Sequence, residues 1–402
     1  MEGQKNMTKK LYYEDTYLKE FDALVTECEK KDDRYLATLD QSAFYPEGGG
    51  QSGDRGLLVR SDQSRIEVLD THEKGEKIVL TCAAPVLEGE KVHGILDWEY
   101  RFDRMQNHSG EHILSGLIHE RYGYNNVGFH MSRDRMTIDL DGEIPEEDLS
   151  ILEKQANEIV WENLPVRIDF LSQEEARNVE YRSKKELSGE IRLVTIPGAD
   201  VCACCGTHVA RTGEIGLVKI LSHERFRSGV RMEIMCGRWA YEYMEQIFRQ
   251  NHEVSVHLSS KMLETGKATG RLVEENARLK ESLTGIRFAQ IDRKAKELEG
   301  AGDVLLFAPE PDARIAMKLT ANVMEGSGGA VFSFAGNDGD GYKYAAGLVD
   351  GDLRNLIREM NAALSGRGGG KPFFQQGSVS ASRQQIEEFL CAKYPRLVTG
   401  DL

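Results

Sequence analysis

Two histidines, His108 and His112, stand four residues apart in a stretch whose pattern predicts a helix. Because four residues make about one turn of an α-helix, both imidazoles leave the same face at a separation that suits a shared metal ion. The opposite arc is apolar and carries Ile113, Leu114, Leu117 and Ile118. The sequence therefore predicts a helix with one face in a core and a histidine face toward a site.

A second pair with ligand spacing, Cys204 and His208, occurs farther along the chain. A thiolate and an imidazole four residues apart can reach one ion, and this mixture of donors favours Zn²⁺. Cys202 or Cys205 could replace Cys204, and of the three we prefer Cys204. The predicted cofactor is zinc, with four ligands: His108, His112, Cys204 and His208.

The first histidine pair has a second interpretation. Residues 108–112 also read His-x-x-Glu-His, the inverted zinc-protease signature in which the glutamate is the general base. Such sites usually take a carboxylate as a third ligand, whereas this chain offers a cysteine and a histidine. On a regular helix Glu111 lies outside the histidine arc, which favours a salt bridge for it, so the protease is the less favoured alternative.

The length and charge of the chain limit the classes of protein that it can belong to. A chain of 402 residues is expected to form two or three domains. No segment approaches the uninterrupted apolar length of a membrane span, and the charged residues 1–17 lack a signal core, so we expect a cytoplasmic protein without a membrane partner. Seven cysteines, three of them clustered, favour metal ligation over disulfides, and the net charge of −15 argues against indiscriminate polyanion binding.

The order of apolar runs and turn residues predicts an α+β fold class. Short strands with Gly, Asp and Asn turns come first, a mixed pattern surrounds the candidate ligands, and a long helical stretch precedes a last mixed region. The predicted domains are a small β-barrel-like domain with a Gly-rich motif (1–95), a zinc-binding α+β domain (96–240), a helical linker with heptads (241–300) and a mixed α/β domain (301–402).

The Gly-rich motif of the first domain contains Gly48, Gly49, Gly50 and Gln51. Consecutive glycines cost backbone entropy, so a fold usually keeps them where the backbone turns sharply or approaches another group closely. One interpretation is a surface hairpin loop. The other is the backbone wall of a ligand site, to which Gln51 presents its amide.

The helical linker carries a short heptad seam. Its members repeat at spacings of four and three: Leu272, Asn276, Leu279, Leu283 and Ile286. The seam can pair two chains in a homodimer or pack within its own domain, and the sequence does not choose between them.

A Gly-rich segment, residues 366–378, lies near the end of the chain, and we expect a loop there. It carries Arg367 and Lys371 with no acidic residue between them, followed by Phe373 and Phe374. Cations and stackable rings on a flexible backbone suit RNA. A mobile connection is the alternative.

Three separated motifs resemble one known family, the editing domain of alanyl-tRNA synthetase and its freestanding relatives of the AlaX type. The motifs are Phe44-Tyr45-Pro46-Glu47-Gly48-Gly49-Gly50-Gln51, the His108/His112 helix, and Cys204-Cys205-Gly206-Thr207-His208-Val209. Residues from about 300 to 400 resemble the C-terminal domain shared by alanyl-tRNA synthetases and DHH-family phosphoesterases, which implies a tRNA-binding type of domain. The chain thus resembles the long form of the freestanding AlaX-type editing proteins, and we expect no aminoacylation module.

The resemblance implies an aminoacyl-tRNA hydrolase that removes serine, or glycine, from mischarged tRNA(Ala). The zinc would polarise the ester carbonyl, lower the pKa of a water or position the tRNA 3′ end, and four protein ligands favour positioning. The resemblance also implies that the three glycines and Gln51 line the amino-acid pocket, together with Ser42, which stands where the family has a threonine. No residue is assigned to proton transfer.

The predicted tRNA contacts are Arg231, Arg367 and Lys371. Residues 211–238 hold six Lys or Arg against three Glu, so a local basic island lies on an acidic chain. Two other functions stay open. The first is a non-catalytic zinc-containing tRNA-binding protein, and the second is a phosphoesterase, which the missing Asp-His-His motif disfavours.

Overall fold

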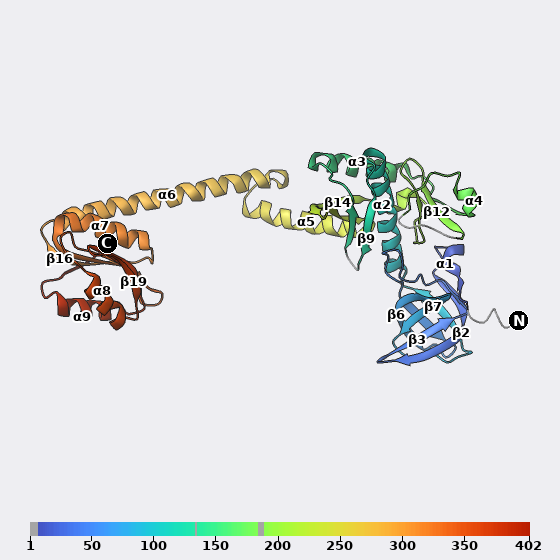
Figure 1. Ribbon diagram of the computed structural model, residues 1–402, viewed down its shortest axis with the longest axis horizontal. Helices are drawn as coiled ribbons and strands as arrows, with labels where there is room; N and C mark the ends of the chain where they lie inside the picture. The colour runs from blue at the N-terminus through green and yellow to red at the C-terminus, as the bar shows by residue number, and fades with distance from the viewer. Residues whose placement is uncertain (1–6, 133–134, 184–188) are drawn as a thin grey trace. The chain divides into compact units, whose positions relative to one another are not determined.

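The computed structural model describes residues 7–132, 135–183 and 189–402 of the chain, which divides into two compact units, Met1–Glu253 and Val254–Leu402 (Figure 1). Helices and strands are mixed in both units, and a small closed barrel lies at the start of the first, so the predicted α+β class is confirmed. The four-part division stays a prediction. In the described part of the chain, no helix is both long enough and apolar enough to cross a bilayer.

Six strands close the barrel in the order β2-β3-β7-β6-β5-β8. In β2, the buried Phe21, Ala23 and Val25 alternate with polar or exposed neighbours, because successive side chains of a strand point to opposite faces. A parallel pair, β1 (Lys9–Lys10) and β4 (Gln41–Ser42), lies beside the short helix α1 (Leu11–Glu14). The barrel strands are β2 (Glu20–Lys31), β3 (Arg34–Leu39), β5 (Gly56–Arg60), β6 (Arg65–Lys74), β7 (Lys77–Cys82) and β8 (Lys91–Leu96).

The predicted histidine helix is α2 (Trp98–Tyr122). The side chain of Asp97 caps its first turn by accepting a hydrogen bond from the backbone N–H of Tyr100 at 3.1 Å, and Gly123 ends it in the left-handed conformation with φ of 72°. Every residue from Asp103 to Ile118 is buried. The helix therefore differs from the expected one-sided helix, because the two sheets and the segment before β5 that carries Gln51 and Asp54 cover its polar face as well.

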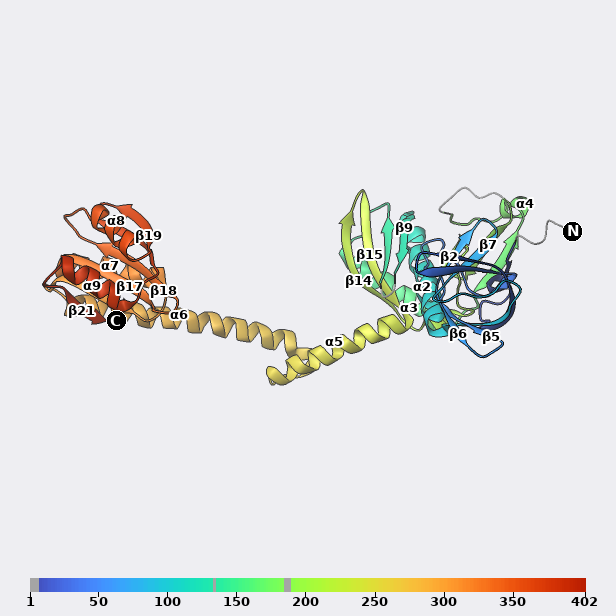
Figure 2. The ribbon, with the colours of Figure 1, turned by 90° about the horizontal axis from the view of Figure 1, so that it is seen from below.

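Two antiparallel sheets and a helix surround α2 (Figures 1 and 2). The four-stranded sheet consists of β14 (Val218–Phe226), β15 (Gly229–Cys236), β10 (Met136–Leu140) and β9 (Asn126–Met131), and the three-stranded sheet of β11 (Arg167–Leu171), β12 (Ile191–Ile196) and β13 (Asp200–Ala203). The other elements are α3 (Glu146–Glu162), α4 (Gln173–Ala176), the 3-10 turn Thr212–Ile215 and α5 (Gly237–His257).

The second unit is a six-stranded sheet between two helical layers, in the order β19-β20-β18-β17-β16-β21. Val304, Leu306 and Val331 pack with α6 and α7 on one face, whereas Phe332 and Phe334 pack with α8 and α9 on the other (Figure 1). The elements are a 3-10 turn (Met262–Glu264), α6 (Thr265–Glu297), β16 (Gly302–Ala308), α7 (Ala313–Ser327), β17 (Gly328–Asn337), β18 (Gly341–Gly347), α8 (Arg354–Ala363), β19 (Arg367–Lys371), β20 (Phe374–Val379), α9 (Arg383–Lys393) and β21 (Val398–Asp401).

The loop predicted for residues 366–378 is wrong, because the segment forms the antiparallel hairpin of β19 and β20. Here the glycines permit close packing. A Cβ on Gly377 would lie 2.7 Å from the Cα of Gly368 and 2.7 Å from the ring of Tyr344. In this segment glycine therefore lets neighbouring strands and the Tyr344 ring pack closely, instead of making the backbone mobile.

The heptad seam lies on α6. Its apolar side chains are exposed by 49–62% at Leu272, Leu279, Leu283 and Ile286. Both interpretations of the seam, pairing with a second chain or packing within the domain, stay predictions.

Candidate metal centre

The four predicted ligands meet at one point of the first unit. One ligand atom from each of His108, His112, Cys204 and His208 lies within 4.8 Å of the other three. The ring of His208 is 4.6 Å from that of His108 and 4.8 Å from that of His112, and the Sγ atom of Cys204 is 3.5 Å from Nε2 of His108. The helix supplies two donors one turn apart, and the segment after β13 supplies the other two. Their role as ligands stays a prediction.

The Nδ1 atoms of the two helix histidines are each held by a side chain that accepts a hydrogen bond. Nδ1 of His108 lies 2.9 Å from Oε1 of Gln51, and Nδ1 of His112 lies 2.7 Å from Oδ2 of Asp200. An amide oxygen and a carboxylate can only accept, so these contacts favour the tautomer with the proton on Nδ1. The lone pair of Nε2 then faces the cluster, as in metal-binding histidines.

The third histidine, His208, also has its Nδ1 atom beside a polar side chain, while its other ring nitrogen has no partner in the described structure. Nδ1 of His208 lies 3.4 Å from Oγ of Ser109, and its Nε2 is buried without a hydrogen-bond partner among the described residues. A buried polar atom without a partner costs free energy. A cation among these donors would remove that cost, so the residues fit a zinc ion.

Asp200 also joins the cluster to a partly buried arginine. Arg182 donates two hydrogen bonds to its carboxylate, both of 2.8 Å. Burial would raise the pKa of Asp200, but the hydrogen bonds from His112 and Arg182 lower it below its usual value. The carboxylate therefore stays ionised and orients the imidazole of His112.

The charge states of Cys204 and His208 suit metal binding. Burial would raise the pKa of Cys204, but the neighbouring His108 and His112 lower it well below the usual value for a thiol. Burial and the charge of His108 lower the pKa of His208 to about 3. A thiolate and a neutral imidazole are the forms in which these groups bind metals.

The three clustered cysteines have different surroundings in the structure. Cys204 is the one that lies with all three histidines, whereas Cys202 lies with His112 and Asp200. Burial raises the pKa of Cys202 to about 11. Cys205 is exposed. The positions favour Cys204 as the thiolate donor.

The Gly-rich motif forms a tight turn against β9, beside His108. Gly49 and Gly50 have φ of 61° and 90°, and a Cβ on Gly50 would lie 2.5 Å from Phe129. The ring of Phe129 stacks on His108 at 5.0 Å. Gly48 closes the turn by pairing with Gln51. The motif thus reaches the cluster through Phe129 and Gln51.

Two predicted pocket residues have partners other than those expected. Gln51 is fully buried, and its amide bonds Thr207 as well as His108, so it holds the cluster together rather than presenting a free amide. The Ser42 hydroxyl accepts a hydrogen bond of 3.1 Å from the backbone N–H of Phe44 and thus lies within its own turn.

The predicted tRNA contacts lie at two separate places. In the basic island 211–238, Lys219, Arg225, Arg231 and Arg238 each form an ion pair. Arg231 binds Asp139 through two hydrogen bonds of 2.6 and 2.8 Å. Much of the predicted basic surplus is therefore neutralised by acids from other parts of the chain. In the second unit, Arg367 and Lys371 are exposed on the edge strand β19.

Sequence analysis missed four residues around the cluster. Gly206 is needed because a Cβ there would lie 2.2 Å from the His108 ring. Asp200, Ser109 and Thr207 bond the ligands or Gln51. Gly206 and Thr207 stand in the third resemblance motif but were given no role there. Asp200 had a signal of its own, because a carboxylate shortly before Cys202 is a common partner of a metal-binding histidine.

Two parts of the chain match families of tRNA synthetases. Residues 191–231 match the family described as the threonyl and alanyl tRNA synthetase second additional domain, and residues 2–100 match class II (A) tRNA synthetases. An alanyl-tRNA editing protein of Pyrococcus horikoshii, AlaX-L, is 31% identical over 94% of this chain and 96% of its own length. The chain belongs to this alanyl-tRNA editing family, in its long form.

A second editing protein agrees with this assignment. An alanyl-tRNA editing protein of Danio rerio is 27% identical over 96% of this chain and 98% of its own length. The C-Ala domain of Aquifex aeolicus alanyl-tRNA synthetase is similar to 24% of the chain and 92% of that domain, with 20% identity and a TM-score of 0.21. Family membership confirms the predicted enzyme class, an aminoacyl-tRNA hydrolase with a role in translation fidelity.

Proposed function

We propose that this chain hydrolyses the ester between serine and tRNA(Ala), with glycine as a second amino acid that it removes, at a zinc ion bound by His108, His112, Cys204 and His208. Serine differs from alanine by one hydroxyl, and a synthetase site that accepts alanine cannot reject it strongly by binding alone. A separate hydrolytic site meets that need. A tRNA substrate would place the protein in the cytoplasm.

One observation carries the proposal. Three histidines and a cysteine converge in a buried site, and His208 keeps a buried Nε2 atom without a partner in the described structure. Gln51, Asp200 and Ser109 contact the Nδ1 side of the three rings. Such orientation is typical of a metal centre and has no evident use in a plain core.

The side chains around the centre have distinct tasks in this proposal. A bound zinc would supply Lewis acidity, either to the ester carbonyl or to a water. Gln51 and Asp200 would keep the imidazoles oriented and in the correct tautomer. The Gly48–Gly50 turn would let the terminal ribose and amino acid come close to the backbone. Ser42 would recognise the serine hydroxyl after its turn opens toward the ligand.

The test is deacylation of Ser-tRNA(Ala), Gly-tRNA(Ala) and Ala-tRNA(Ala) by zinc-loaded protein. We expect rapid loss of serine, measurable loss of glycine and retention of alanine. The Ser42→Ala variant should slow serine release while its zinc content stays unchanged. Protein that binds zinc and tRNA but spares all three esters would instead be the non-catalytic tRNA-binding protein.

A further inference from the structure

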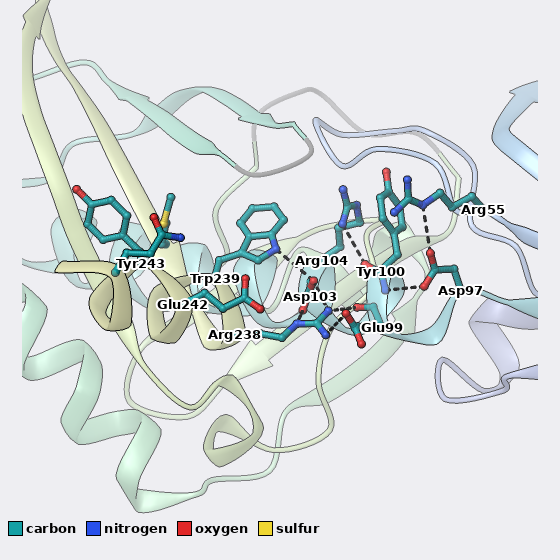
Figure 3. A pocket seen from close by; sticks show the side chains of 12 residues that line it. Arg55, Asp97, Glu99, Tyr100, Asp103, Arg104, Arg238, Trp239, Glu242 and Tyr243 are labelled. Carbon is teal, nitrogen blue, oxygen red and sulfur yellow. Dashed lines mark hydrogen bonds and ion pairs between the residues drawn. The ribbon is translucent and has the colours of Figure 1, made fainter. Parts of the chain in front are cut away.

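A pocket of about 740 Å³ lies in the first unit, between the first turns of α2 and the first turns of α5 (Figure 3). Arg55, from the turn that precedes β5, closes one side. Trp239, Glu242, Tyr243 and Gln246 line another side together, because spacings of three and four place them on one face of α5. None of these side chains belongs to the candidate metal centre.

Arg104 is the unusual member of the lining. It is 1% exposed, yet it has no carboxylate partner among the described residues, and its Nε has no hydrogen-bond partner there. Its other nitrogens donate to the backbone oxygens of Tyr100 at 3.1 Å and Ser132 at 3.5 Å. A buried charge that lacks an opposite charge is costly and is rarely kept for stability. Its position at an open pocket indicates a ligand that supplies the negative charge.

The other two arginines of the pocket are already neutralised. Arg55 lies 3.2 Å from Asp97. Arg238 donates to Asp103 at 2.6 and 2.9 Å and also pairs with Glu99. Among the described lining residues, Arg104 is therefore the arginine without an ion-pair partner, and Glu242 is the carboxylate without one, so an entering anion would meet Arg104 on the side of the pocket formed by α2.

The aromatic side chains suit a nucleotide rather than a bare anion. The Tyr100 ring lies between the guanidinium groups of Arg104 and Arg55, at 3.1 and 3.8 Å, as Figure 3 shows. Tyr243 is 38% exposed and offers a ring to a base. Glu242 beside it is exposed and can accept a hydrogen bond from an exocyclic amino group of cytosine or adenine.

The pocket is close to the metal centre along α2. Arg104 precedes His108 by one helical turn, a rise of about 6 Å. The strand β9 and the residue that follows it run beside both, because Phe129 in β9 stacks on His108 and Ser132 just after β9 accepts from Arg104. We propose that the pocket holds an unpaired nucleotide of the tRNA acceptor end, with its phosphate on Arg104 and its base against Tyr243. This inference rests on the proposed function, because that function places the terminal ribose at the metal centre.

Binding of uncharged tRNA tests the pocket without requiring catalysis. The variant is Arg104→Met, and each protein is titrated with intact tRNA(Ala) and with the same tRNA shortened by its unpaired 3′ nucleotides. We expect Arg104→Met to bind the intact tRNA about 10- to 100-fold more weakly, with unchanged affinity for the shortened one. The slope of log K against log salt should fall by about 0.7 for one lost phosphate contact.

Thermal stability separates a ligand contact from a structural role. The buried charge of Arg104 has no carboxylate partner among the described residues, although it stacks on Tyr100, so the unfolding temperature of Arg104→Met should stay within about 2 °C of the wild type. Arg121→Met is the matched control, since Arg121 also lies on α2 but pairs with Asp148 away from the pocket. This control should bind both tRNAs as the wild type does.

Three results of the comparison with Arg104→Met would overturn the proposal. They are equal losses for intact and shortened tRNA, no loss for either, or a fall of the unfolding temperature by more than about 4 °C. Displacement of intact tRNA by equimolar cytidine monophosphate would overturn it too, because the pocket would then serve a free nucleotide. If the wild type spares every aminoacyl ester, the proposed function fails, and the uncharged-tRNA titration still decides the pocket.

Discussion

At the scale of single residues, the orientation of the three imidazoles in the candidate metal centre depends on side chains outside the proposed ligand set. Gln51 comes from the Gly-rich turn, Asp200 begins β13, and Ser109 lies on α2 between the two helix histidines. Each contacts the Nδ1 side of a different imidazole. A change at any of these residues should therefore alter metal affinity without removing a donor.

Cys204→Ser should lose most of its bound zinc, because Cys204 is the thiol that lies with all three histidines. Cys202→Ser should keep nearly full occupancy, since Cys202 lies beside His112 and Asp200 only. The measurement is zinc per chain by elemental analysis after dialysis. Cys205→Ser, at an exposed position, serves as the control. Equal losses in the first two variants would defeat the assignment of Cys204.

Asp200→Asn should bind zinc about 10- to 100-fold more weakly, because the neutral amide no longer fixes the tautomer of His112 and leaves Arg182 without its carboxylate. Competition with a chromophoric chelator measures this affinity independently of activity. Asp169→Asn, at an exposed position of β11, is the matched control. An unchanged affinity in Asp200→Asn would mean that the carboxylate has no influence on the centre.

At the scale of elements, a helix or strand fixes the direction in which charged side chains point, and the local sequence does not reveal that direction. The strand β19 holds Arg367 and Lys371 in a regular exposed edge of the sheet. Residues four apart on a strand lie on the same face, so both cations point the same way. A paired strand presents them in a fixed geometry, which a flexible loop would not.

The double variant Arg367→Ala/Lys371→Ala should weaken tRNA binding and reduce the slope of log K against log salt by about 1.5 to 2, if each cation contacts one phosphate. Filter binding over a range of salt concentrations measures the slope. Arg314→Ala/Arg354→Ala removes the same charge from the same unit, at exposed arginines that pair with Asp312 and Asp352. Identical slopes for the two double variants would exclude a specific role for β19.

The exposed seam of α6 supports a homodimer as a proposal. Leu279→Glu/Leu283→Glu places charges in the middle of the seam and should convert a dimer to a monomer. Sedimentation velocity measures the mass. Leu263→Glu, at a 99% exposed residue outside the seam, is the control. A wild-type chain that sediments as a monomer would end the proposal.

At the scale of the whole molecule, the two units have separate cores. The barrel and the sheets around α2 form one unit, and the six-stranded sheet with its helices forms the other. Chains of this kind need not unfold in a single transition. All four candidate zinc ligands belong to the first unit.

Removal of zinc should therefore lower the unfolding temperature of the first unit and leave the second unit unchanged. A ligand present at 1,000 times its Kd stabilises the native state by about 4 kcal/mol. Calorimetry with and without a chelator measures both transitions. The Cys204→Ser protein should show no chelator effect. A chelator that moves both transitions equally would contradict separate units.

Much of the fold could be predicted because its signals are local. Apolar alternation marks barrel strands, and the spacing of four residues places His108 and His112 on one helix face. The cap residues Asp97 and Gly123 mark the ends of that helix. Such signals depend on backbone geometry within one or two turns, which neighbouring residues determine.

The sequence by itself thus determined the types of donor, their pairing along the chain and the mixed class of the fold. Only the tertiary structure decided which cysteine meets the histidines, which carboxylate supports His112, and that the Gly-rich segment 366–378 becomes a hairpin. It alone placed Arg104 at an open pocket with no carboxylate partner for its guanidinium among the described residues. The physical reason is that these contacts join residues distant in the chain, and no local pattern records the space between them.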